Sequence, residues 1–176
     1  MKKITILNGN PKEEDFGFDE YCEKFQTYLG KMGNQVNLIK LRDKKIGDCI
    51  GCYSCWLKTP GRCAFKDDYP IILKAYVNSD LIIMASPMIM GFVSSELKKA
   101  TDRLLPLLHP FLRVNEDRMA HYPRYDKAAK TGLILEKDST YEESDLKLIN
   151  ATYRTAAFIR FTDDDMEVVA HEAHNL

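Results

Sequence analysis

Four of the chain's five cysteines lie within one short stretch. They are Cys49, Cys52, Cys55 and Cys63 in the run CIGCYSCWLKTPGRC. An iron–sulfur cluster needs four thiolates, and proteins often take three from a tight C-x-x-C-x-x-C run and one from further away. A structural zinc ion also takes four ligands, but more often as two separated pairs. The spacing therefore suits a cluster better than zinc.

A redox-active dithiol is a third use of the same cysteines. A reactive thiol needs positive charge nearby to lower its pKa, and Lys58 and Arg62 are the basic residues inside the stretch. In a fourth interpretation the cysteines bind nothing and line a loop beside another site. Cys22 falls within a helical pattern, and we expect it to be buried.

Size and composition predict one soluble domain over residues 1–176. Hydrophobic residues make up 45% of the chain, charged residues make up 29%, and the net charge is −1. This balance gives no general electrostatic reason to bind nucleic acid. The longest apolar run, residues 81–93, is shorter than the roughly 20 residues that cross a membrane. With no secretory signal, the odd number of cysteines favours reduced thiols in the cytoplasm.

Apolar residues follow the alternation of strands and the spacing of helices along the chain. The pattern predicts strands at residues 1–7, 35–41, 80–86, 130–136 and 167–173. It predicts helices at residues 19–32, 69–77, 94–108 and 139–159. Residues 113–127 are polar, contain proline and tyrosine, and indicate an irregular excursion. The alternation is typical of an α/β fold with a parallel sheet and right-handed crossovers.

In such a sheet, ligands bind beyond the carboxyl ends of the strands. The loop after the third predicted strand, residues 86–95, is apolar although a turn there should lie at the surface. A flat apolar ligand would explain this composition, and so would a partner subunit that covers the loop. From these residues alone, both explanations stay open.

Several short motifs, taken in their order along the chain, resemble one protein family. They are the Gly9-Asn10-Pro11 turn, the cysteine run with Gly61-Arg62-Cys63, the pair Asp67-Asp68, Ser86-Pro87, and Leu97-Lys98 with Asp102-Arg103. Together they are similar to the NADPH-dependent FMN reductase branch of the flavodoxin-like superfamily, which includes iron–sulfur flavoproteins. The resemblance implies a flavodoxin-like three-layer sandwich, a five-stranded parallel sheet in the order 2-1-3-4-5, and a homodimer or homotetramer.

The resemblance also implies which residues bind FMN. The turn of Gly9, Asn10 and Pro11, with Lys12 as the neighbouring cation, would approach the phosphate. Glu136 and Lys137 would border one edge of the isoalloxazine ring. The apolar turn would line the ring and exclude water from it; its residues are Pro87, Met88, Ile89, Met90 and Gly91.

The first loop departs from the family pattern. Flavin-binding relatives usually carry a serine and an Asn-Thr pair there, whereas residues 12–18 supply one lysine and three carboxylates, Glu13, Glu14 and Asp15. Like charges about 4 Å apart repel by on the order of 4 kcal/mol at an intermediate dielectric constant. These carboxylates would therefore oppose a phosphate unless they point to solvent.

These expectations predict an FMN-dependent NAD(P)H oxidoreductase that passes electrons to a small acceptor such as a quinone, a nitro compound or free flavin. We predict no bound metal, because flavin-only relatives keep a similar Cys-Ile-Gly-Cys segment and the related iron–sulfur flavoproteins have a shorter last gap. One alternative is an iron–sulfur flavoprotein electron carrier that uses all four clustered cysteines. Another is a non-catalytic relative that has lost FMN and uses the acidic first loop to bind a protein partner.

Overall fold

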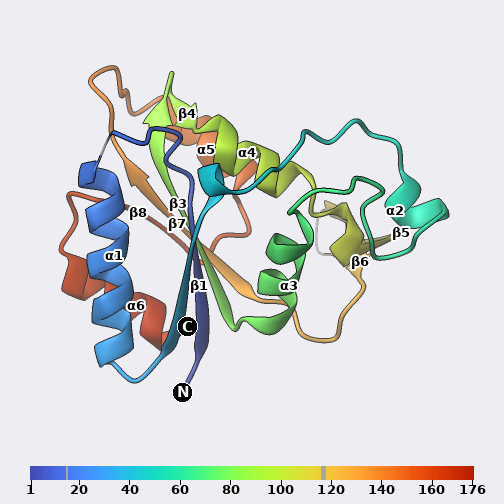
Figure 1. Ribbon diagram of the computed structural model, residues 1–176, viewed down its shortest axis with the longest axis horizontal. Helices are drawn as coiled ribbons and strands as arrows, with labels where there is room; N and C mark the ends of the chain where they lie inside the picture. Colours follow the sequence, from blue (N-terminus) through green and yellow to red (C-terminus); the bar gives the residue numbers. More distant parts are fainter. Residues whose placement is uncertain (15, 116–117) are drawn as a thin grey trace.

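The computed structural model describes residues 1–14, 16–115 and 118–176. Five parallel strands form its central sheet, in the order β2-β1-β3-β7-β8 (Figure 1). Their bounds are β1 Lys3–Asn8, β2 Gln35–Lys40, β3 Leu81–Ile89, β7 Lys130–Glu136 and β8 Phe158–Phe161. Counted among themselves, the five strands follow the predicted order 2-1-3-4-5. A short strand, β4 Phe92–Val93, pairs antiparallel with the end of β3.

Helices cover both faces of this sheet. Two of them, α1 Phe16–Lys31 and α6 Met166–Asn175, lie on one face, and three, α3 Pro70–Asn78, α4 Ser95–Asp102 and α5 Asp145–Thr152, lie on the other (Figure 1). Alternate residues of β3 enter the two cores: Ile83 packs with α1 and α6, and Ile82 packs with the other three helices. This burial on both faces explains why β3 is almost wholly apolar, and it confirms the three-layer sandwich.

The last strand and helix were predicted wrongly. Residues 167–173 form part of α6 rather than a strand, and the fifth strand is β8, which lies partly in the range assigned to a long fourth helix. Helix α6 buries Val169, Ala170 and Ala173, a spacing that places all three on one helical face. The Asp165 carboxylate caps this helix by accepting from the Glu167 amide at 2.8 Å. Asp165 was the local signal for this helix.

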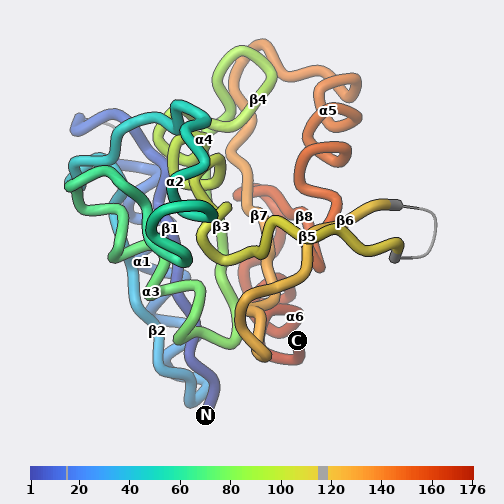
Figure 2. Tube along the Cα trace, turned by 90° about the vertical axis from the view of Figure 1, so that its right-hand side faces the viewer, coloured from blue at the N-terminus to red at the C-terminus, as the bar shows by residue number. Residues whose placement is uncertain are grey.

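The predicted helix 94–108 is also shorter than expected. Helix α4 ends at Asp102, and a turn of 3₁₀-helix, η2 Leu105–Leu107, leads into a two-stranded hairpin. Pro106 and Pro110 lack the amide that a continuing helix requires. The hairpin consists of β5 Leu108–Asn115 and β6 Arg118–Pro123, and it extends away from the sheet (Figure 2). The supposed irregular excursion at residues 113–127 therefore contains ordered strands.

The segment between β2 and α3 contains the cysteines and little regular structure. It begins with a single 3₁₀ turn, η1 Leu41–Asp43, and includes one short helix, α2 Ser54–Leu57. An aspartate stands just before α3, where Asp67 accepts from the Tyr69 amide at 3.2 Å. No helix within the described ranges has both the length and the apolar character needed to cross a membrane.

Candidate functional site

The loops after β1 and β3 lie against each other at the carboxyl end of the sheet. The Gly9 amide donates to the Ala85 carbonyl oxygen at 2.8 Å, and the Ser94 hydroxyl donates to the Gly9 carbonyl oxygen at 2.5 Å. A Cβ atom on Gly9 would lie 2.9 Å from Leu97 Cβ, so this close approach requires glycine. Folding therefore joins the first loop to the start of α4, at the edge where ligands of this topology bind.

The apolar turn after β3 is a tight hairpin. Met90 and Gly91 connect β3 to β4, and both have positive φ, 53° and 74°. Met90 is 92% exposed and Ile89 is partly exposed, whereas Met88 is buried in the core. Pro87 is half-buried. The ring-lining role expected of this turn can therefore come from Ile89, Met90 and Gly91, but the Met88 side chain faces the core.

The loop after β7 reaches the same turn. The Asp138 carboxylate accepts from the Thr140 hydroxyl and amide at 2.8 and 2.9 Å, and these bonds, with a smaller contribution from the Met90 amide, hold the pKa of Asp138 below its usual value. Glu136 lies opposite Pro87 in the strand register. The loops after β1, β3 and β7 thus gather at one end of the sheet.

Lys137 forms an ion pair and contacts an aromatic ring at this end of the sheet. Its ammonium donates to the Asp163 carboxylate at 2.9 Å and lies 4.3 Å from the centre of the Phe161 ring. This ion pair raises the pKa of Lys137 and lowers that of Asp163. Both side chains are partly exposed, so the pair holds Lys137 in place more than it stabilises the fold.

A buried carboxylate, Asp19, lies beside the first loop. It stands in the first turn of α1 and accepts from Asn8 Nδ2 at 2.8 Å, Asn10 Nδ2 at 3.2 Å and Arg42 Nη1 at 3.0 Å. Arg42 Nη2 makes a second, shorter contact, and Lys40 Nζ lies 3.3 Å away. Burial alone would raise the pKa of Asp19, but the hydrogen bonds from Arg42, Asn8, Asn10 and Lys40 outweigh it and hold that pKa well below its usual range.

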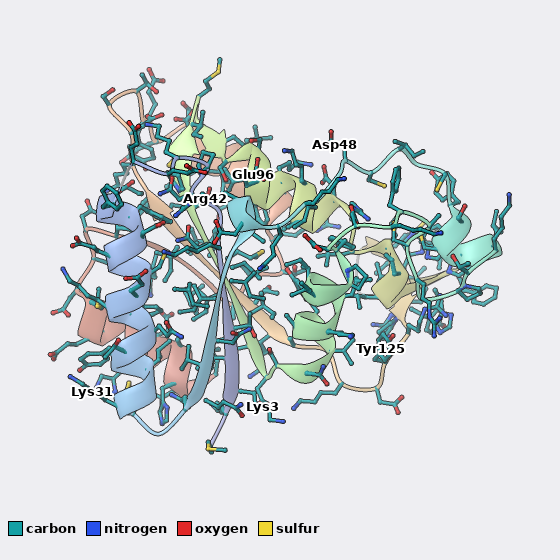
Figure 3. All side chains as sticks on the ribbon, in the orientation of Figure 1. Lys3, Lys31, Arg42, Asp48, Glu96 and Tyr125 are labelled. Atoms are coloured by element: carbon teal, nitrogen blue, oxygen red, sulfur yellow. The ribbon has the colours of Figure 1, made fainter. Side chains whose placement is uncertain are left out.

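Sequence reasoning did not identify this network. Arg42 follows β2 in η1, at the same end of the molecule as the amino end of α1 (Figure 3). The sequence signal for Asp19 was only an acidic residue near a helix start, and its partner Arg42 stands 23 positions further along the chain. Lys12, Glu13 and Glu14 of the first loop are exposed, and Asp15 lies outside the described residues.

The four clustered cysteines line one small cavity of about 20 Å³. Cys49 and Cys52 are exposed, and Cys55 and Cys63 are half-buried. Burial, followed by the nearby Cys63, raises the pKa of the Cys55 thiol, whereas hydrogen bonds to Ser54 lower that of Cys52. Cys22 is separate from this group and buried in the core, as expected.

Arg103 also lines this cavity. Its side chain is almost fully buried and forms a paired contact with Asp67, with Nη1 to Oδ2 at 2.5 Å and Nη2 to Oδ1 at 3.1 Å. Nη2 also donates to Cys63 Sγ at 3.1 Å, and the guanidinium lies 4.2 Å from the centre of the Tyr69 ring. The buried Nε has no hydrogen-bond partner among the described residues. Arg103 therefore places one guanidinium donor directly against the Cys63 thiol.

The four cysteines are suitable ligands for a metal cluster, but their side chains are not arranged to hold one. Four thiols and a neighbouring guanidinium suit an anionic iron–sulfur cluster. However, over residues 1–14, 16–115 and 118–176, no three His, Cys, Asp or Glu side chains are arranged to hold a metal ion. The cysteine loop would have to rearrange before its sulfur atoms could share a cluster.

The residues suit the ring of FMN better than its phosphate. The turn of Ile89, Met90 and Gly91 presents an exposed apolar surface where the three loops meet. At the first loop, by contrast, the Asn10 amide donates to Asn8 Oδ1 at 2.8 Å and the Lys12 amide donates to Asn10 Oδ1 at 3.0 Å. The amides of Asn10 and Lys12 are therefore already paired within the loop.

Solved structures share this architecture. An azoreductase from Bacillus anthracis aligns with a TM-score of 0.66 at 11% sequence identity and covers 100% of both chains. An NAD(P)H:quinone oxidoreductase from Methanothermobacter marburgensis aligns with a TM-score of 0.61 at 13% identity, covering 99% of this chain and 96% of that one. At these identities the similarity establishes the flavodoxin-like fold.

Curated relatives and a family model give the sequence relationship. An iron–sulfur flavoprotein of Methanocaldococcus jannaschii is 40% identical over 105 residues, which are 60% of this chain and 53% of that protein. An iron–sulfur flavoprotein of Archaeoglobus fulgidus is 35% identical over 109 residues, 62% of this chain and 48% of that protein. The chain therefore spans about half the length of the curated relatives it matches. The model for NADPH-dependent FMN reductase matches residues 2–122, more than half of the chain and the part that contains the loops after β1 and β3, so the protein belongs to the NADPH-dependent FMN reductase family.

Proposed function

We propose that this protein is an FMN-dependent NAD(P)H oxidoreductase that passes electrons to a small acceptor such as a quinone, a nitro compound or free flavin. The observation that carries the proposal is its membership of the NADPH-dependent FMN reductase family, because the matched residues include two of the three loops that meet at the carboxyl end of the sheet. A flavin, when bound, supplies the hydride and electron chemistry. The protein supplies binding, orientation and exclusion of water.

The chain's own residues have distinct tasks in this proposal. Ile89 and Met90 offer the apolar surface on which a planar ring can lie. Gly91 allows close approach of that ring, because it has no side chain and holds a positive φ. Glu136 borders the ring from the neighbouring strand, next to Pro87 in the register. No side chain is assigned a proton-transfer step.

Assembly and location complete the proposal. A homodimer or homotetramer in the cytoplasm would suit reduced thiols and a partly exposed apolar turn. Nucleic acid is not expected as a partner in view of the net charge of −1. A membrane is not expected either, because the longest apolar run, residues 81–93, is shorter than a membrane span.

One visible absorption spectrum tests the proposed cofactor. The protein is purified without oxygen, and FMN is then added in a titration. We expect flavin absorption bands in the purified protein or after the titration, followed by oxidation of NADH or NADPH when a quinone is added. Protein that is colourless and acquires no flavin bands at micromolar FMN would refute the proposal, and would favour a non-catalytic relative.

An iron–sulfur electron carrier is the second candidate function. It is favoured by the four cysteines around one cavity and by the iron–sulfur flavoproteins among the curated relatives. Iron and acid-labile sulfide analysis of anaerobically purified protein tests it. Four irons per chain, lost in Cys63→Ser but kept in Cys22→Ser, would establish the cluster, and iron-free protein would exclude it.

A further inference from the structure

Three amides at the start of the first loop already make hydrogen bonds. The Gly9 amide donates to Ala85, the Asn10 amide to the Asn8 side chain, and the Lys12 amide to the Asn10 side chain. Pro11 has no amide hydrogen to donate. A phosphate placed against these three amides would have to break hydrogen bonds that they already make.

The donor side chains that surround Asp19 are likewise already engaged by its carboxylate. Five contacts reach this carboxylate, from Asn8, Asn10, two nitrogens of Arg42 and, at 3.3 Å, Lys40. An ionised carboxylate offers about four lone-pair positions, so these contacts saturate it. The Asp19 carboxylate therefore accepts from the donors that a bound anion would need.

The two cations that contact Asp19 are compensated by carboxylates, and the exposed Lys12 is followed directly by Glu13 and Glu14. Lys40 also pairs with Glu23 at 2.9 Å, and Asp43 lies 3.9 Å from Arg42. The two cations are thus matched by Asp19 and two further carboxylates within the described residues. A phosphate dianion would add negative charge to a cluster that is already compensated.

We propose that Asp19 is a built-in anion that takes the place of the cofactor's phosphate, so that this site recognises a flavin by its ring and not by its 5′-phosphate. The inference rests on the proposed function and narrows its ligand class. Riboflavin and FMN share the ring, which meets the turn of Ile89, Met90 and Gly91. FMN alone carries the 5′-phosphate, which the first loop does not bind. Asp19 is the residue that removes a preference for FMN over riboflavin.

The test compares two flavins in the full-length protein. Riboflavin and FMN are titrated separately, and binding is followed by quenching of flavin fluorescence. We expect the two dissociation constants in the native protein to lie within about threefold of each other, because the phosphate gains no charge-assisted hydrogen bonds. In Asp19→Asn, Arg42 and Lys40 lose their carboxylate, and FMN should bind about tenfold tighter relative to riboflavin.

Glu20→Gln is the matched control. Glu20 is an exposed neighbour in the same helix and pairs only weakly with Lys24 at 3.6 Å. The ratio of the riboflavin and FMN dissociation constants should therefore be the same in this variant as in the native protein. Native protein that binds FMN tenfold or more tighter than riboflavin would overturn the inference while leaving the proposed function intact, even if Asp19→Asn does not fold. The inference would also be overturned if the ratio of the riboflavin and FMN dissociation constants were the same in Asp19→Asn as in the native protein. Native protein that binds neither flavin would refute the proposed function and the inference together.

Discussion

At the scale of single residues, the buried pair of Arg103 and Asp67 makes the sharpest prediction. We expect Asp67→Asn to lower the free energy of unfolding by about 3 kcal/mol, because the change leaves a guanidinium buried without its carboxylate. Urea denaturation at neutral pH measures this loss. The same variant should decrease the reactivity of Cys63 toward a thiol reagent, because Arg103 would no longer be held against its sulfur atom and a thiol is more reactive beside positive charge.

Asp68→Asn is the control for this prediction. The Asp68 side chain is exposed and accepts from the Lys45 amide at 2.8 Å, and asparagine keeps an oxygen for that bond. Its effect should stay below about 1 kcal/mol. Equal losses in the two variants would show that the Arg103 pair contributes nothing specific to stability.

At the scale of elements, the contact between β7 and β8 depends on one glycine. Gly132 lies opposite Phe158 in the register, and a Cβ atom at Gly132 would come within 2.2 Å of the Phe158 ring. We therefore expect Gly132→Ala to destabilise the protein by about 1–3 kcal/mol through overpacking, as measured by thermal and urea unfolding. Adding Phe158→Leu should recover part of that loss.

A second glycine provides a control, because its replacement by alanine should not lower stability. Gly30 lies in α1, and a Cβ atom there meets nothing within 4 Å. Gly30→Ala should leave stability unchanged or raise it by up to about 1 kcal/mol, because alanine favours the helix. If both alanine variants destabilise equally, close packing of β7 on β8 is not the cause.

At the scale of the whole molecule, acid should unfold the protein through its buried carboxylates. Burial raises and hydrogen bonds lower the pKa of Asp19 and Asp67, and in both cases the net effect is a lowered pKa. Their contribution is complete above the unfolded pKa of about 4 and is lost as pH falls below it toward the folded pKa. We expect native stability to fall more steeply below pH 4 than that of Asp19→Asn, by on the order of 2 kcal/mol, in urea melts at stepped pH. The exposed Asp48→Asn should follow the native curve (Figure 3).

Assembly is the other property of the whole molecule. The hairpin of β5 and β6 carries exposed apolar side chains at Phe111, Leu112, Val114 and Met119. Sedimentation analysis should give two or four times the chain mass of 20.2 kDa. Val114→Lys should weaken the assembly, whereas Val168→Lys, an exposed change on α6, should not. A native protein that sediments as a monomer would contradict this prediction.

Local sequence determined the alternation of strands and helices, because the spacing of apolar residues fixes which side of each element is buried. That was enough for the α/β fold and the burial of Cys22, whereas the strand order was implied by the family resemblance. It failed for α6 and β8, where a short strand and an amphipathic helix have similar apolar content over a few residues. It also missed the hairpin that follows α4.

Only the tertiary structure decided which charges meet. Asp19 and Arg42 stand 23 positions apart, and Asp67 and Arg103 stand 36 apart. Each pair forms because strand order and register bring the ends of different elements together, and no local pattern encodes that meeting. The sequence alone therefore indicated the family and the loops of its site, while the assembled fold showed that the Asp19 carboxylate accepts from Asn8, Asn10 and Arg42 beside the first loop.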